Sequence, residues 1–184
     1  MNDIVLIKPT MEYADVIMAY RKEFLNAGSS MDGCGSLRRI DNAEDFIKDV
    51  ENDLHTETLK EGRVLATLLL GVRTCDNKVV GMIQIRHYFN EFLEKYAGNI
   101  GYSVRPSERR KGYAKQMLRL SLPICKSIGL EKVLIACEPD NIGSEKTIQA
   151  NGGVYEATVY CQPEDIYLKR YWIDLHSRRK MIGG

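Results

Sequence analysis

The spacing of apolar residues in the first third of the chain predicts one strand followed by two helices. The apolar run at residues 4–7 ends at a lysine and a proline, which is typical of a short strand. Thr10 can then cap a helix whose apolar side chains recur every three or four residues until Gly28. A second set of apolar residues, spaced four apart, predicts an amphipathic helix over residues 42–55.

Two β-rich runs in the middle of the chain predict an antiparallel hairpin. They span residues 63–73 and 79–89, and the segment between them contains Asp76 and Asn77, which favour a turn. The segment after the hairpin, residues 90–98, favours one or two helical turns as far as Ala97. A further strand is expected from Asn99 to Val104.

The last third of the chain predicts two more helices and three strands. Apolar spacing favours a helix over residues 112–128 that ends at Gly129. Pro123 lies inside this segment and is expected to kink or interrupt the helix, because proline lacks the backbone donor and crowds the carbonyl four residues earlier. The remaining elements are a buried strand at 132–137, a helix at 141–150 and strands at 154–160 and 166–173.

This order of elements predicts one α/β domain that spans residues 1–184. A chain of 184 residues has the size of a single domain, and it contains no linker-like tract or internal repeat. A twisted mixed sheet of six to seven strands with helices on both faces is the simplest arrangement that buries all of these elements.

The charge of the chain argues against binding to nucleic acid or to a membrane surface. With 26 basic and 25 acidic residues the net charge is +1, so no global field attracts an anionic polymer or bilayer. Basic clusters at residues 105–115 and 178–180 allow a nucleic-acid reading, but they contain no interleaved aromatic residues for stacking on bases. We expect any charge-based function to be local.

The cysteines and the N-terminus point to a cytoplasmic protein without a metal site. The five cysteines form no CxxC pair and no metal-ligand spacing, so we expect buried thiols in a reducing compartment. The first residues lack the pattern of a secretory signal, and the longest apolar run, at residues 64–72, is too short for a membrane helix. These cysteines are Cys34, Cys75, Cys125, Cys137 and Cys161.

The stretch from strand 99–104 into the following helix has the chemistry of an anion cradle. Amides at a helix start lack intrahelical partners and sit at the positive end of the helix dipole, so they favour a phosphate oxygen. Gly112 allows close approach of the backbone, and Ala114 keeps the first turn small. Arg109, Arg110, Lys111 and Lys115 add positive charge. A lone basic loop is more often a solvated turn, so the flanking elements matter to the argument.

The motif Arg109-x-x-Gly112-x-Ala114 resembles the R/Q-x-x-G-x-G/A signature of the GNAT superfamily of acyl-CoA N-acyltransferases, and the similarity extends over residues 79–155. It implies direct attack of an amine on acetyl-CoA, with no acyl-enzyme and no metal. It also implies that the Val104 N–H polarises the thioester carbonyl. The cofactor-binding residues implied are Tyr102, Ser103, Val104, Arg109, Arg110, Lys111, Gly112, Tyr113, Ala114, Lys115, Asn141 and Ser144.

The residues expected to move protons depart from the family pattern. Relatives that acetylate protein N-termini commonly carry a glutamate and a tyrosine at the positions occupied here by Ala136 and Ile148. Glu138 is the first candidate for the base, and a buried core thiol is favoured over a nucleophile for Cys137. Further candidates are Asp140 and His87 as bases and Tyr102 and Tyr155 as acids.

The resemblance does not identify the acceptor substrate or the oligomeric state. The first hypothesis is an N-acetyltransferase for a primary amine of a small molecule, and the second is a CoA-binding module without catalysis. The strand at residues 167–173 can pair across a homodimer or close the sheet. Scattered acidic residues can attract a cationic amine, namely Glu12, Asp15, Glu23, Glu44 and Glu91.

Overall fold

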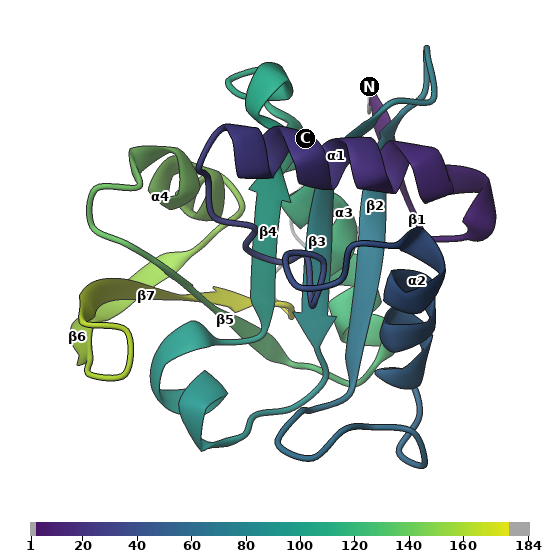
Figure 1. Cartoon of the computed structure of the whole chain (residues 1–184). Coiled ribbons are helices and arrows are strands. Elements are labelled where there is room, and N and C mark those ends of the chain that lie inside the picture. The colour runs from purple at the N-terminus through teal and green to yellow at the C-terminus, as the bar shows by residue number, and fades with distance from the viewer. Residues whose placement is uncertain (1–2, 177–184) are drawn as a thin grey trace.

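The computed structural model describes residues 3–176, which form seven strands and four α-helices (Figure 1). The strands are β1 (Ile4–Ile7), β2 (Ala66–Arg73), β3 (Val79–Arg86), β4 (Ile100–Val104), β5 (Lys132–Cys137), β6 (Val154–Cys161) and β7 (Ile166–Asp174). The helices are α1 (Ala14–Asn26), α2 (Ala43–Asn52), α3 (Tyr113–Ser127) and α4 (Ile142–Gln149). Three short helical segments accompany them: η1 (Met11–Tyr13), the π-helical η2 (Leu93–Ala97) and η3 (Pro106–Glu108).

The expected mixed α/β fold is confirmed, but its strands lie in two sheets rather than one. The first sheet has the order β1-β2-β3-β4 and the second the order β5-β7-β6. Every strand pair in these two sheets is antiparallel, including the predicted β2-β3 hairpin. The sheet divides because β4 and β5 diverge, and this divergence creates the space described below.

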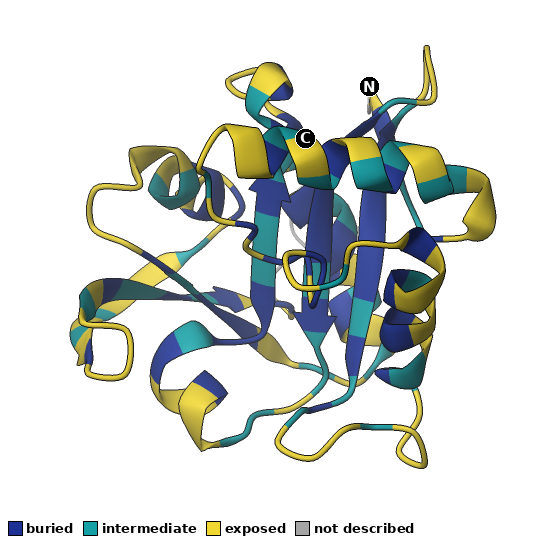
Figure 2. Ribbon diagram, in the orientation of Figure 1, coloured by how far each residue is buried: buried dark blue, intermediate teal, exposed yellow. Residues whose placement is uncertain are grey.

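Both faces of the first sheet are covered by helices. In Figure 1, α1 crosses in front of strands β2 to β4, α2 lies next to β2, and α3 lies behind the sheet. Alternate residues of β2 face opposite ways, so Leu68 and Leu70 join the α1–α2 core while Leu69 joins the α3 core. This explains why β2 and β3 are nearly continuous apolar runs, and why both strands are dark blue in Figure 2.

Two glycines let α3 lie close to the sheet. Gly71 and Gly81 face each other in the β2-β3 register. A Cβ atom on either residue would come within 2.7 Å of the sulfur of Met117 on α3. The buried Met117 side chain therefore fills the space that these two residues leave, and this contact fixes how α3 packs.

Helix α3 is continuous through Pro123, so of the two predicted effects, a kink or an interruption, the interruption does not occur. Leu118 and Leu122 before the proline and Cys125 after it are all buried in the core behind the first sheet. Apolar burial on both sides of the proline outweighs the loss of one hydrogen bond.

No helix within residues 3–176 is long and apolar enough to cross a membrane.

The first helical segment also differs from its prediction. Thr10 precedes η1, its side chain makes no capping hydrogen bond, and α1 begins only at Ala14. The cap of α2 is instead as the sequence suggests, because the Asn42 side chain accepts a hydrogen bond of 2.8 Å from the Asp45 amide.

Asn99 joins the two sheets at the point where β4 and β5 begin to diverge. Its amide donates to the Leu134 carbonyl at 2.7 Å, and its side-chain oxygen accepts from the Leu134 amide at 2.9 Å. Its side-chain nitrogen donates to the Arg86 carbonyl at 3.2 Å. The buried Asn99 side chain thus ties β3, β4 and β5 together at one end, and the strands separate toward the other end.

Strand β7 closes the second sheet. It lies between β5 and β6 and pairs with both along most of its length. Because both edges of β7 are occupied, the structure agrees with the second of the two predicted alternatives, in which this strand closes the sheet rather than pairing across a homodimer. In the second sheet β6 is an outer strand, and its exposed side chains include Val154, Tyr155 and Tyr160.

Candidate active site

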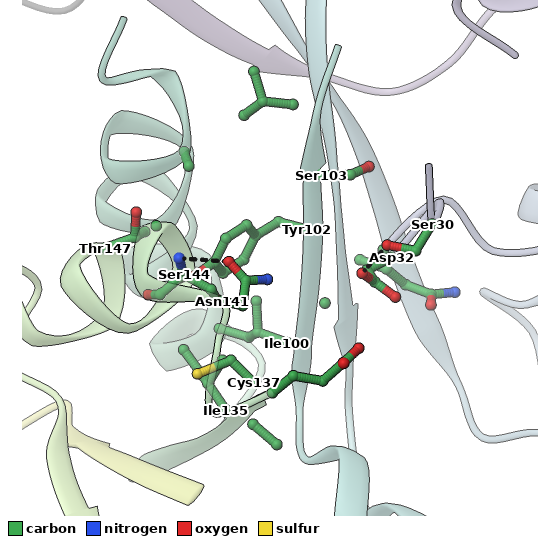
Figure 3. A pocket seen from close by; sticks show the side chains of 18 of the residues that line it. Ser30, Asp32, Ile100, Tyr102, Ser103, Ile135, Cys137, Asn141, Ser144 and Thr147 are labelled. Carbon is green, nitrogen blue, oxygen red and sulfur yellow. Dashed lines mark hydrogen bonds between the residues drawn. The ribbon is translucent and has the colours of Figure 1, made fainter. Parts of the chain in front are cut away.

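A cavity of about 1080 Å³ opens between β4 and β5 and reaches the start of α3. Figure 3 shows Tyr102, Asn141 and Ser144 on one side of β4, and Ser30 and Asp32 on the other. The predicted cofactor residues that line this cavity are Tyr102, Ser103, Val104, Arg109, Arg110, Gly112, Tyr113, Ala114, Lys115, Asn141 and Ser144. Lys111 is the predicted cofactor residue that does not line it.

The start of α3 presents backbone amides to this cavity. Gly112 is the N-cap, with φ +83°, and it has no side chain that could accept from the amides of the first turn. Arg110 is also left-handed, with φ +64°, which is uncommon for a residue with a side chain. Successive amides in such a turn converge on one point and favour an anion, so the residues present fit a diphosphate.

The buried Glu108 carboxylate fixes the loop that leads into α3. It accepts from Lys78 at 2.5 Å, from Lys111 at 2.8 Å and from Arg73 at 2.9 Å. Hydrogen bonds from Lys111 and Lys78 lower its pKa to about 2. Lys111 therefore holds the loop through Glu108 rather than facing the cavity. Lys111 is a local partner, but no local sequence pattern identifies the whole cluster, because Arg73 and Lys78 flank the distant β2-β3 turn.

Two arginines of the basic cluster are engaged by α1. The Arg109 guanidinium lies 5.6 Å from the centre of the Phe24 ring, and its Nε donates to the Val104 carbonyl at 3.2 Å. The buried Arg105 lies 3.4 Å from the Glu23 carboxylate. These contacts reduce the charge available to a nucleic acid, and residues 178–180 lie outside the described part of the chain.

The backbone of β4 has unpaired positions that face the cavity. The Arg105 amide donates to Val80 of β3, and in an antiparallel ladder the direction of the N–H groups alternates along the strand. The amides of Tyr102 and Val104 therefore point away from β3. Since β4 is the outer strand of its sheet, these groups can pair with an extended ligand as they would with another strand.

The start of α4 forms the opposite wall of the cavity. The Asn141 side chain caps this helix by accepting from the Ser144 amide at 3.0 Å. The Ser144 hydroxyl lies 2.9 Å from the Tyr102 hydroxyl, so α4 is tied to β4 across the gap. Both polar side chains predicted from sequence thus stand beside the cavity (Figure 3).

A family profile described as Acetyltransferase (GNAT) domain matches residues 5–154. The chain belongs to the GNAT acetyltransferases. It is therefore an acyltransferase, and acetyl-CoA is its acyl donor. A search of curated protein sequences finds no match.

Solved structures share the fold over nearly the whole chain. The microcin C7 self-immunity acetyltransferase MccE, in complex with acetyl-CoA and AMP, has a TM-score of 0.70 at 18% identity, with 95% of this chain and 93% of that chain covered. A ribosomal-protein-S5-alanine acetyltransferase from Vibrio fischeri has a TM-score of 0.69 at 16% identity, with 96% of each chain covered. The putative acetyltransferase yncA from Salmonella typhimurium, with acetyl-CoA, has 0.65 at 11% identity and covers all of both chains.

Two of the proton-transfer candidates line the cavity of this GNAT fold. Glu138 follows β5 and is exposed, and Tyr102 lies on β4. Burial raises the pKa of Tyr102, so its hydroxyl stays protonated at neutral pH. At the two departures from the family pattern, Ala136 lines the cavity and Ile148 is fully buried.

The other proton-transfer candidates lie elsewhere. His87 bonds to the Thr67 hydroxyl at 2.8 Å, and burial lowers its pKa. The exposed Tyr155 bonds to Thr158 at 2.9 Å. Neither of these side chains lines the cavity, nor does Asp140. Sequence alone could not distinguish His87, Tyr155 and Asp140 from Glu138, because all four are polar residues at or near strand ends.

The cysteines are buried with one exception. Cys75 is exposed in the β2-β3 turn, so its predicted burial is wrong. Cys137 lines the cavity, yet burial raises its pKa to about 11. A thiol with this pKa is protonated at neutral pH, which favours the expected core thiol over a nucleophile.

Several polar residues that sequence reasoning missed also line the cavity: Ser29, Ser30, Asp32, Gln84, Arg86, Lys146, Thr147 and Glu164. Asp32 belongs to a loop that packs on β4, where the backbones of Gly33 and Gly101 meet so closely that a Cβ on Gly33 would lie 2.1 Å from the Gly101 carbonyl oxygen. The repeated glycines of this loop were the available signal. None of the acidic residues predicted to attract an amine lines the cavity: Glu12, Asp15, Glu23, Glu44 and Glu91.

Proposed function

We propose that the chain transfers the acetyl group of acetyl-CoA directly to a primary amine of a small molecule. The observation that carries the proposal is that the uncapped amides at the start of α3 and the Glu138 carboxylate open into the same cavity. An anion cradle and a proton acceptor in one space are what this reaction requires.

The cofactor-binding roles follow from the lining of the cavity. The amides of residues 110–115 would hold the CoA diphosphate, with Arg110 and Lys115 adding charge. The outward-facing edge of β4 would pair with the pantetheine arm, and the Val104 N–H would polarise the thioester carbonyl. Asn141 and Ser144 would contact the cofactor from α4. Acetyl-CoA supplies an activated acetyl thioester.

Glu138 is proposed as the general base, acting through water. The acceptor amine must be neutral to attack, so its ammonium form first gives up a proton toward the carboxylate. The amine nitrogen then forms a bond to the acetyl carbon while the carbon–sulfur bond breaks. The nitrogen loses its second proton, and the departing sulfur gains one.

The acceptor class is inferred from the departures at residues 136 and 148. An alanine and a fully buried isoleucine cannot supply the acid and base common in relatives that act on protein N-termini. Solved structures of the same fold include a ribosomal-protein-S5-alanine acetyltransferase and a microcin C7 self-immunity acetyltransferase. The same departures support the second candidate, a CoA-binding module without catalysis.

The two candidate functions are separated by measuring binding and turnover on the same protein. Calorimetry with acetyl-CoA tests the cradle, and CoA release across a panel of primary amines tests transfer. Binding with turnover on at least one amine supports the proposed function. Binding without turnover on any amine favours the module, and no binding overturns both.

Replacing Glu138 with glutamine is expected to lower kcat by about 100-fold while acetyl-CoA binding is retained, because a positioned base typically contributes that much. The control is Glu131→Gln, which removes an exposed carboxylate just before β5 that does not line the cavity. The measurement is the pH dependence of CoA release. Normal turnover of the Glu138 variant at every pH would reject the base.

A further inference from the structure

A second, smaller cavity of about 220 Å³ adjoins the main one. The two cavities share Gly35, Gln84, Arg86 and Phe92 in their linings, so these residues stand between them. The main cavity contains the proposed transfer site. Because Arg86 also lines this main cavity, an acceptor bound there can reach the arginine.

The small cavity is lined by three arginines and one aspartate, Asp53. Arg63 forms ion pairs with two carboxylates, because its Nη1 lies 2.9 Å from Asp49 and 3.0 Å from Asp53. Arg39 and Arg86 form no ion pair with any carboxylate within residues 3–176. The lining thus carries positive charge that the described residues do not neutralise.

The Arg86 guanidinium is the cation at the junction of the two cavities. Arg86 is the last residue of β3, and its backbone amide donates to the Asn99 carbonyl at 2.7 Å. Its Nη1 donates to the neutral Gly98 carbonyl at 3.2 Å. Burial lowers its pKa, and Asp32 opposes this effect from beyond ion-pair distance. A half-buried cation without a bonded carboxylate is stabilised when an anion binds to it.

The diphosphate of CoA cannot be that anion. In the β3-β4 register, Gly81 lies opposite Val104 and Ile85 lies opposite Ile100. The Arg86 guanidinium lies beside Gly101, because its Nη2 is 3.5 Å from a Cβ atom built there. Gly101 is three residues from Val104, about 10 Å along the strand. The anion cradle lies still farther on, after Val104, so an anionic group of the acceptor can be the partner of Arg86.

Three carboxylate residues line the main cavity: Asp32, Glu138 and Glu164. Glu138 follows β5, and Asp32 lies on the loop that packs on β4, where its Oδ2 accepts from the Ser30 hydroxyl at 2.8 Å (Figure 3). A cationic amine is attracted to these carboxylates, whereas an anionic group is attracted to Arg86. The lining of the main cavity thus complements a molecule that carries a positive charge on its amine and a negative charge on another group.

We infer that the acceptor is an amine that also bears an anionic group, a carboxylate or a phosphate, and that Arg86 binds this group. The inference rests on the proposed acetyl transfer and names its substrate class. Gln84, which lines both cavities, is placed to donate a neutral hydrogen bond to the same group.

The test compares matched acceptors that differ only in the anionic group. Amino acids are paired with their carboxamides, and phosphoethanolamine is paired with ethanolamine. We expect at least one anionic member to exceed its neutral partner by about tenfold or more in kcat/KM, as expected for a hydrogen bond to a charged group. The pair that shows the preference distinguishes carboxylate from phosphate. Equal or better use of every neutral member would overturn the inference.

The variant Arg86→Gln should remove this preference by raising KM for the anionic member alone. A purely structural role of Arg86 would instead weaken both members of a pair equally. Arg86→Lys should restore part of the preference, because it keeps the charge without the planar fork. Arg119→Gln, on the exposed face of α3 and outside both cavities, is the control. A preference that persists in Arg86→Gln would contradict the inference.

If no amine is turned over, binding replaces turnover as the readout. Calorimetry of the CoA-saturated protein with each anionic amine should then show binding that is lost in Arg86→Gln. Absence of such binding overturns the inference about the acceptor. Normal CoA binding in the same experiment leaves the cofactor site intact, so the two failures are distinguishable.

Discussion

The variant Gly112→Val is expected to abolish measurable acetyl-CoA binding while the fold remains intact. Gly112 lies at the N-cap of α3 and lines the main cavity, and a Cβ atom built on it meets no protein atom within 4 Å. A valine side chain there would not clash with the core. It would stand beside the amides of the first turn and block the approach of a phosphate.

Gly129→Val is a closely matched control for this variant. Gly129 follows the other end of α3, its φ is +91° against +83° for Gly112, and a Cβ atom there also meets nothing within 4 Å. Both variants carry a similar backbone strain of about 1–2 kcal/mol, which thermal unfolding measures. Calorimetry should show loss of acetyl-CoA binding in Gly112→Val alone. Unchanged binding in that variant would mean that the cradle is misplaced.

The variant Glu108→Gln is expected to lower the free energy of unfolding by about 3 kcal/mol, because it leaves the cations around a buried carboxylate uncompensated. Glu108 is 4% exposed and is bonded to Arg73, Lys78 and Lys111. Chemical denaturation measures the effect. Asp76→Asn is the control, because Asp76 binds the same Arg73 from an exposed position and its loss should lower the free energy of unfolding less than the loss of Glu108 does. Equal effects of the two variants would contradict the assigned role of Glu108.

The contribution of Glu108 should also depend on pH. Its pKa is lowered to about 2 in the folded protein, from an ordinary value of 4.5. The folded state therefore favours the charged form, and the stabilisation is fully present above pH 4.5. It should decline as the pH falls toward 2. The difference in stability between the wild type and Glu108→Gln, measured by denaturation at several pH values, should shrink over that range. A constant difference would rule out titration of Glu108 as its source.

The sequence predicted most of the elements because their signals are local. The β2-β3 hairpin shows two β-rich runs and an Asp-Asn turn within 27 residues, and Asn77 indeed adopts φ +56° in that turn. The prediction for α3 failed only at Pro123, where a local rule competed with burial on both sides. Propensity describes one segment at a time, whereas packing of α3 against β1, β3 and β4 decided its continuity.

The candidate site was predictable where its groups belong to one segment. The motif from Arg109 to Ala114 combines a strand end, a glycine and a helix start, so its chemistry follows from backbone geometry. The choice among Glu138, Asp140 and His87 was not predictable in this way. Each is a polar residue near a strand end, and only the divergence of β4 from β5 decides which of them faces the cavity.

By itself the sequence determined the order of helices and strands, the segment proposed as the anion cradle and the resemblance to the GNAT family. The tertiary structure alone decided that the strands divide into two sheets at Asn99, that Glu108 clamps the cradle loop and that Arg86 stands at the junction of two cavities. The physical reason is sequence distance. Periodicity and turn signals act within a few residues, whereas Glu108 meets Arg73 across 35 residues, and such meetings are fixed only when the sheet and its helices pack.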